Sequence, residues 1–167
     1  MMIYRIATCI LSFFITIFLV SCHDDDPVSH DTGITVQNAR TSECGGFSSL
    51  RNAVSADTTV QETLSWKYDS AAGIIEFTNS HVQLNCCGKH SITASLDGGT
   101  IVISESDQPT DNGRCKCLCL FDFAIDVMGT FGNVLTVRLQ RTVDTELAME
   151  KTFEIDLSKA SGNLTVK

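Results

Sequence analysis

The sequence predicts an all-β domain, an antiparallel β-sandwich that is immunoglobulin-like in the broad sense. After residue 59, apolar and polar residues alternate in eight or nine short runs, roughly ten residues apart, which is the pattern of half-buried strands. Turn-forming residues separate the runs, and no convincing helical period lies between them. A lipocalin-like closed barrel is the alternative, because sandwiches and barrels have the same alternation.

The first two strands differ in the regularity of their alternation. Residues 60–68 have apolar side chains at mostly even positions, and residues 69–73 form the turn that follows. The next run begins at Ile74 and has apolar residues first at odd and then at even positions. Because a pleated strand cannot change face without an irregularity, a bulge or turn is expected at residues 79–80, beside His81.

A hairpin and a polar loop come next. Residues 92–96 and 101–103 are two strands, and the sequence Asp-Gly-Gly at residues 97–99 is the tight turn between them. Residues 106–113 are rich in Asp, Pro, Asn and Gly. These residue types favour turns, so we expect a loop there.

The longest strand is expected at residues 115–127, where every odd position holds a cysteine or an apolar residue. The odd face must therefore face the core. Residues 135–139 and 153–157 predict two further strands by the same alternation. Residues 145–151 predict a short helix or a loop.

The N-terminus predicts a bacterial lipoprotein. Residues 1–21 combine the basic Arg5 with an apolar stretch that is too short for a permanent membrane-spanning helix. The stretch ends at Leu-Val-Ser-Cys, residues 19–22, which resembles a lipobox, the cleavage site before an acylated cysteine. We therefore expect residues 1–21 to be a signal peptide and Cys22 to anchor the mature chain in outer-membrane lipid.

A tether and a single domain follow the anchor. The acidic run at residues 24–26 resembles the export signal that sends Bacteroidota lipoproteins to the outer face of the outer membrane. A solvated spacer is the alternative, since like charges repel and extend a chain. Residues 22–33 are the tether in either case, and residues 34–167 form one β domain. The expected location is the outer membrane, with the domain facing the exterior.

Three motifs resemble a group of uncharacterised Bacteroidota surface lipoproteins. They are Asn-Cys-Cys at residues 85–87, Cys-Lys-Cys-Leu-Cys at residues 115–119 and Phe-Asp at residues 121–122. The resemblance covers roughly residues 74–128 and implies a surface location and this fold class, without an established activity. The family often has Tyr where this chain has Phe121, which argues against a role that needs a hydroxyl there.

Six cysteines remain once Cys9 leaves with the signal peptide and Cys22 is acylated. Outside the cytoplasm an even set predicts disulfides, with a metal site and reduced buried thiols as the alternatives. Cysteines two apart on one strand are badly placed for a bridge, and so are adjacent cysteines. Each cysteine of residues 115–119 should therefore join one of the other three, which leaves six connectivities. The candidates are Cys44, Cys86, Cys87, Cys115, Cys117 and Cys119.

The metal alternative combines the three cysteines of residues 115–119 with His81 or His90. Thiolate and imidazole suit zinc or cuprous copper, and cysteines two apart on a strand point the same way. No C-x-x-C turn of the familiar zinc frameworks is present in the sequence. The ligand set of this alternative is Cys115, Cys117, Cys119 and His81.

Catalytic and calcium chemistry receive less support. His81, Asn85 and Cys87 have a spacing that any strand gives, and no hydrolase or redox motif occurs, so no catalytic residue is assigned. The loop after residue 104 carries hard oxygen ligands without EF-hand spacing, and a solvated turn is the preferred interpretation. Its oxygen-bearing side chains are Glu105, Asp107, Asp111 and Asn112.

Two classes of function remain. The first is a non-enzymatic, lipid-anchored surface module that binds a glycan, a small ligand or an envelope protein. The alternative is a metal-binding or thiol-active domain that uses the cysteine strand. No cofactor is expected. The net charge of -8 disfavours nucleic acid as a partner, because each phosphate contact needs a basic side chain.

Overall fold

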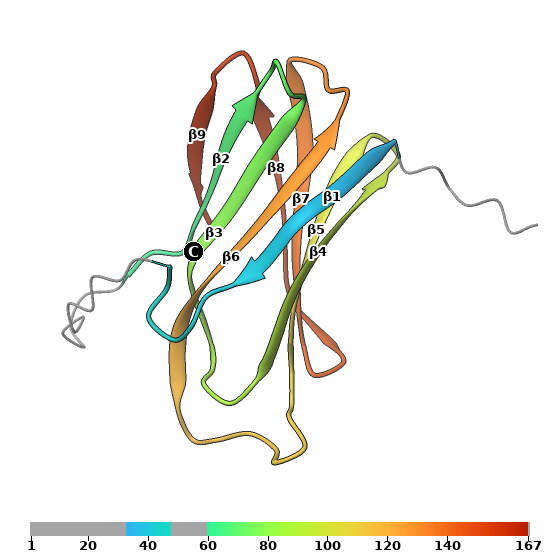
Figure 1. Ribbon diagram of the computed structural model, residues 1–167. Helices are drawn as coiled ribbons and strands as arrows, with labels where there is room; N and C mark the ends of the chain where they lie inside the picture. Colours follow the sequence, from blue (N-terminus) through green and yellow to red (C-terminus); the bar gives the residue numbers. More distant parts are fainter. Residues whose placement is uncertain (1–32, 48–59, 167) are drawn as a thin grey trace, which may run out of the picture. The chain divides into compact units, whose positions relative to one another are not determined.

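The described part of the chain, residues 33–47 and 60–166 of the computed structural model, forms two facing β-sheets (Figure 1). The first sheet has the order β1-β6-β3-β2-β9 and the second the order β4-β5-β7-β8. The strands are β1 (Ile34–Thr41), β2 (Thr63–Asp69), β3 (Ile74–Asn85), β4 (Lys89–Asp97), β5 (Thr100–Gln108), β6 (Leu118–Gly129), β7 (Val134–Val143), β8 (Glu146–Asp156) and β9 (Ser161–Thr165).

This arrangement confirms the predicted β-sandwich. Each sheet ends in two edge strands, β1 and β9 in the first and β4 and β8 in the second, so the described strands do not close into the alternative barrel. The first sheet is antiparallel throughout. The second is mixed, because β5 and β7 run parallel and the chain visits β6 in the first sheet between them.

The core lies between the sheets and follows the alternation seen in the sequence. Phe77 on β3 and Phe123 on β6 are fully buried in the first sheet, and Ile103 on β5 and Leu139 on β7 are fully buried in the second. Successive side chains of a strand point to opposite faces, so every second residue reaches the core. Burial of a large apolar side chain contributes about 1.5–3 kcal/mol, and this core stabilises the sandwich.

The predicted irregularity in β3 is confirmed. The register between β3 and β6 shifts between Asn79 and Val82, and His81 has a positive φ of 64°, which is uncommon for a residue with a side chain. The backbone N–H of His81 donates to Oδ1 of Asp122 at 3.0 Å, and its side chain is exposed. The bulge therefore turns His81 towards solvent while Val82 enters the core.

The hairpin is also confirmed. Strands β4 and β5 pair from Asp97 and Thr100 outward, and Gly98 and Gly99 have φ values of 55° and 84°. Two-residue turns that match the twist of a hairpin need positive φ at both central positions, which glycine adopts without steric cost.

The longest strand begins later than the sequence predicts. Strand β6 starts at Leu118, so Cys115 and Cys117 precede it, and Cys117 is exposed rather than in the core. The side-chain amide of Asn85 donates to the carbonyls of Cys115 at 2.7 Å and Cys117 at 3.3 Å. These bonds hold the segment in an irregular conformation beyond the end of the ladder.

The prediction for residues 145–151 is wrong, because residues 146–151 belong to β8. Most of these side chains are exposed, since β8 is an edge strand, and the sequence therefore lacks an apolar alternation there. Residues 106–108, predicted as loop, continue β5. Strands β1 and β9 were not predicted individually, because both are edge strands without a fully buried residue and therefore lack a clear apolar alternation.

The predicted signal peptide, Cys22 and almost all of the tether lie outside the described residues. The described residues 33–47 and 60–166 belong to one compact unit. In residues 33–47 and 60–166, no helix is long and apolar enough to cross a membrane.

Candidate functional site

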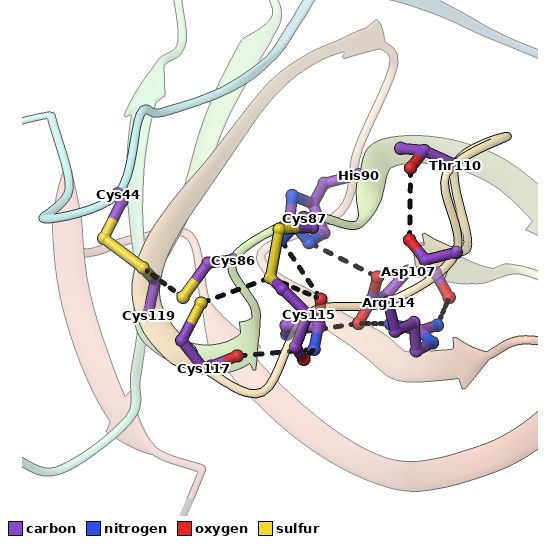
Figure 2. The surroundings of a disulfide bond; sticks show 12 residues. Cys44, Cys86, Cys87, His90, Asp107, Thr110, Arg114, Cys115, Cys117 and Cys119 are labelled. Carbon is purple, nitrogen blue, oxygen red and sulfur yellow. Dashed lines mark hydrogen bonds and ion pairs between the residues drawn. A yellow bond between two sulfur atoms is a disulfide. The ribbon is translucent and has the colours of Figure 1, made fainter.

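The six cysteines of the domain lie together at one end of the sandwich, and we call them the cysteine cluster (Figure 2). Four chain segments contribute to it: the segment after β1, the turn between β3 and β4, the loop before β6, and the first residues of β6. The cluster consists of Cys44, Cys86, Cys87, Cys115, Cys117 and Cys119.

Two disulfides cross the cluster. Cys44 is bonded to Cys119 with a Cα separation of 5.4 Å, and Cys87 to Cys115 with a Cα separation of 5.6 Å. Both distances are within the usual range for disulfides. Each bridge joins one cysteine of residues 115–119 to one of the other three, as the sequence predicts. Neither bridge links cysteines two apart or adjacent in the chain.

The other two cysteines, Cys86 and Cys117, are free thiols. The Sγ atom of Cys86 lies 2.9 Å from Sγ of Cys119, and that of Cys117 lies 3.2 Å from Sγ of Cys115. A hydrogen bond between the thiols of Cys86 and Cys117 is the largest cause that raises the pKa of Cys86 above its ordinary 9.0. Each thiol therefore lies between the other thiol and a disulfide.

The predicted metal ligands are only partly brought together. Among the described residues, the sulfur atoms of Cys86, Cys115 and Cys117 lie within 4.8 Å of one another. His81 is not in this group and lies at the bulge of β3, and Cys119 is bonded to Cys44. Because Cys115 is also in a disulfide, three thiolates become available only after the Cys87–Cys115 bridge is reduced.

A buried carboxylate supports the cluster from the second sheet. Asp107, at the end of β5, accepts a hydrogen bond from Nη1 of Arg114 at 2.9 Å and one from the backbone N–H of Asn85 at 3.4 Å. Nε2 of His90 lies 3.4 Å from the second oxygen of Asp107. These contacts link the cysteine turn, the loop before β6 and strand β5 (Figure 2).

His90 is held mainly by packing. Its ring packs against Phe121 at an interplanar angle of 46°, with 4.2 Å between the ring centroids. Burial lowers the pKa of His90 below its ordinary 6.5, although the nearby Asp107 carboxylate opposes this shift. His90 is therefore a largely neutral, largely buried ring at neutral pH that lies between Phe121 and the Asp107 carboxylate.

The four oxygen-bearing side chains that were considered for calcium lie partly in the core and partly on the surface. Glu105 and Asp107 are each only 1% exposed and belong to β5, whereas Asp111 and Asn112 are exposed. A loop site needs several oxygens that converge on one point. These four side chains do not offer that arrangement, because half of them are committed to buried ion pairs.

Sequence reasoning missed a second buried polar group in the core. The signal was present, because Asn79, Glu105 and Arg141 each continue the core-facing alternation of an apolar strand at the next position of the same face. Glu62 completes the group from the segment before β2. The members of this buried ionic group are Glu62, Asn79, Glu105 and Arg141.

A polar hollow of about 630 Å³ lies where β4 begins and β5 ends. Hydroxyl, amide, ammonium and carboxylate groups line it, without an aromatic ring. The lining residues are Lys89, Ser91, Ser106, Gln108, Pro109, Thr110 and Asp111.

The arrangement supports no catalytic assignment among the predicted residues. Cys87 is bonded to Cys115 and is not a free nucleophile. Asn85 is used in holding the backbone before β6, and His81 faces solvent.

Compared with protein-family models, with curated proteins and with solved structures, the chain matches none of them.

Proposed function

We propose that this chain is a lipid-anchored module of the outer membrane that faces the exterior and binds a ligand or partner without catalysing a reaction. The observation that carries the proposal is the pair of disulfides Cys44–Cys119 and Cys87–Cys115. Disulfides persist in oxidising compartments outside the cytoplasm. They commit four of the six domain cysteines to crosslinking rather than to catalysis.

The anchor is Cys22, which stands apart from this set. Its neighbours resemble a lipobox, and the acidic run after it resembles a surface export signal. A single acyl chain gives only marginal membrane binding, whereas the two or three chains of a lipoprotein anchor hold a domain stably. Asn-Cys-Cys at residues 85–87 and Cys-Lys-Cys-Leu-Cys at residues 115–119 resemble motifs of uncharacterised Bacteroidota surface lipoproteins.

The polar hollow is the ligand site that we favour. Sugars offer many hydroxyl groups, and the hollow is lined by the hydroxyl or amide groups of Ser91, Ser106, Gln108 and Thr110. Each of these groups makes a hydrogen bond within the protein and keeps an oxygen that can accept a further hydrogen bond. Lys89 and Asp111 add one charge of each sign at its wall. A hydroxyl-rich ligand such as a glycan therefore fits this lining better than an apolar small molecule does.

A metal-binding or thiol-active function is the second candidate. It is favoured by one observation, the three sulfur atoms of Cys86, Cys115 and Cys117 within 4.8 Å of one another. Soft thiolate ligands select cuprous copper or zinc. This function requires that the Cys87–Cys115 bridge is open in the exported protein.

The experiment on anchoring and export uses whole cells. We expect the native chain to incorporate labelled palmitate and the Cys22→Ala variant to incorporate none. Replacing residues 24–26 by alanine should protect the domain from protease added outside the cells. Acylation that persists in Cys22→Ala would contradict the anchor, and unchanged protease access in the triple variant would contradict the export signal.

The experiment on binding uses the detergent-solubilised full chain on an array of bacterial and host glycans. Binding should be lost in Lys89→Ala and Gln108→Ala and retained in Lys159→Ala, which removes an exposed lysine at the turn after β8. Retention of glycan binding in both hollow variants would contradict this site. No binding to any glycan, with an envelope protein crosslinked to the intact cells instead, would replace the glycan by a protein partner.

A further inference from the structure

We propose that Cys86 and Cys117 form a third disulfide in the exported protein, and that Cys117 is the sulfur through which the external oxidant reacts. This inference uses the register of β3 and β6 and the exposure of the two thiols. It goes beyond the binding function, and its test does not depend on where the protein is located.

The register places Cys86 opposite Cys117. In the ladder between β3 and β6, Leu84 pairs with Cys119 and Asn85 pairs with Leu118. The next pair in this register is Cys86 with Cys117, and the backbone N–H of Cys86 donates to the carbonyl of Cys117 at 3.2 Å. Directly opposed residues of an antiparallel pair have Cα atoms about 4.5–5.5 Å apart, which is within the range that a disulfide spans.

The side chains agree with the backbone. The sulfurs of Cys86 and Cys117 belong to the same group of three within 4.8 Å, and Figure 2 shows both between the two existing bridges. Cys44, Cys87, Cys115 and Cys119 are already paired, so no other partner remains in the described part of the chain. Of the six connectivities open to the sequence, one contains both observed bridges, and it joins Cys86 to Cys117.

The two thiols differ in access. Cys117 is exposed, whereas Cys86 is half-buried. A dissolved disulfide reaches Cys117 first, because thiol exchange needs direct access to the attacking sulfur. Cys86 then lies beside the sulfur that has been activated.

The chemistry is a two-electron oxidation in which a disulfide compound is the oxidant. The Cys117 thiolate attacks one sulfur of the compound, a mixed disulfide forms, and the other half leaves as a thiolate. The Cys86 thiolate then attacks the Cys117 sulfur, the Cys86–Cys117 bond forms, and the second half leaves. The two protein thiols lose two protons and two electrons, and the oxidant is reduced to two thiols.

Trypsin separates the relevant cysteines unusually well. Cleavage after Arg114 and Lys116 gives a peptide of residues 115–116 and a peptide of residues 117–138, so Cys115 and Cys117 are no longer in one piece. The other two peptides with cysteines of the cluster are residues 41–51, with Cys44, and residues 68–89, with Cys86 and Cys87. The number of covalently joined species therefore reports the third bridge.

The experiment treats the purified full chain with oxidised glutathione, blocks free thiols with N-ethylmaleimide at low pH, and digests it without reductant. We expect one species that joins all four cysteine peptides. Two separate species with N-ethylmaleimide on Cys86 and Cys117, or a bond between Cys115 and Cys117, would overturn the proposal. Retention of stoichiometric zinc or copper by both thiols after this treatment would also overturn it.

Two single variants test the order of reaction and the pairing. Cys86→Ser should accumulate a glutathione adduct on Cys117 and keep both other bridges. Cys117→Ser should leave Cys86 as a free thiol with little adduct, because that sulfur is half-buried. An adduct on Cys115 in Cys86→Ser would show a different pairing, and faster reaction of Cys86 than of Cys117 would contradict the assigned entry point.

Discussion

The guanidinium of Arg141 donates two hydrogen bonds to one carboxylate oxygen of Glu105 inside the sandwich, from Nε at 2.8 Å and from Nη2 at 2.5 Å. The same guanidinium binds both oxygens of Glu62, at 2.7 and 3.2 Å. The amide of Asn79 donates to one oxygen of each carboxylate. The buried ionic group therefore ties the first sheet, through Asn79 on β3, to the second, through Glu105 on β5 and Arg141 on β7.

The first prediction concerns the removal of the cation. Arg141→Met should lower the free energy of unfolding by about 3–5 kcal/mol, because it leaves two buried carboxylates without their counter-charge. Urea denaturation of the purified chain measures this change. The matched control is Arg40→Met, whose ion pair with Glu76 is about half exposed and should cost less than about 1 kcal/mol. Equal losses in the two variants would contradict the role assigned to Arg141.

The second prediction concerns pH and Glu105. Burial is the largest cause that raises the pKa of Glu105 above its ordinary 4.5, although Arg141 and Asn79 oppose it. The folded chain therefore keeps a proton at pH values where the unfolded chain has lost it, so this group's contribution to stability falls as pH rises from about 4.5. The unfolding free energy of the native chain should therefore fall relative to that of Glu105→Gln as the pH rises from about 4.5. A difference that is constant with pH would contradict the shift.

The third prediction has the opposite sign and concerns His90. Because burial lowers the pKa of His90 below its ordinary 6.5, the unfolded chain binds the proton first as the solution is acidified. The contribution of His90 to stability is therefore present above about pH 6.5 and is lost as pH falls below it. His90→Gln should remove this loss, and His81→Gln, at an exposed histidine, should retain it. Urea unfolding of the native chain and both variants at several pH values measures the loss of stability below pH 6.5. The same loss in His90→Gln as in the native chain would contradict the prediction.

The alternation of apolar and polar residues predicted the bulge in β3 but not the buried ionic group. The change of apolar phase in β3 predicted an irregularity at residues 79–80, because burial on one face fixes the register, and the observed shift lies between Asn79 and Val82. Asn79, Glu105 and Arg141 have the same phase as their buried neighbours, yet the alternation alone did not predict that these polar residues are buried. Only their mutual pairing, which joins residues far apart in the sequence, makes their burial favourable.

The cysteine pairing shows the same limit. Strand geometry excluded bridges within residues 115–119 and between adjacent cysteines, and both observed bridges agree. Strand geometry did not predict that β6 begins at Leu118, because the side chain of Asn85 holds the preceding segment by its carbonyls. A contact of one amide with two distant carbonyls leaves no periodic signal in a sequence.

The fourth prediction concerns Gly88, in the turn between β3 and β4. A Cβ atom at this position would lie 2.0 Å from Oδ1 of Asp107, a carboxylate that Arg114 and the Asn85 backbone hold in place. Gly88→Ala should therefore destabilise the domain by about 1–3 kcal/mol, as overpacking does. The control is Gly132→Ala, where the nearest atom would be 3.9 Å away. Thermal unfolding of both variants distinguishes a steric effect from a general cost of replacing glycine.

The last prediction compares the two observed bridges. In the chain-entropy description, the stabilisation from a crosslink increases with the logarithm of the number of residues in the loop that it closes. Cys44 and Cys119 are 75 residues apart, and Cys87 and Cys115 are 28 apart. If these were the only crosslinks, replacing each pair by serine would cost about 4.5 and about 3.6 kcal/mol, respectively.

A bridge between Cys86 and Cys117 changes this comparison, because it closes almost the same loop as Cys87–Cys115. Loss of Cys87–Cys115 would then release few additional conformations of the unfolded chain, whereas loss of Cys44–Cys119 would remain costly. We therefore expect Cys87→Ser/Cys115→Ser to lose far less unfolding free energy in urea than Cys44→Ser/Cys119→Ser. Adding Cys86→Ser to Cys87→Ser/Cys115→Ser removes the third bridge as well. This triple variant should therefore lose nearly as much unfolding free energy as Cys44→Ser/Cys119→Ser. Nearly equal losses in the two double variants would indicate that Cys86 and Cys117 are not crosslinked.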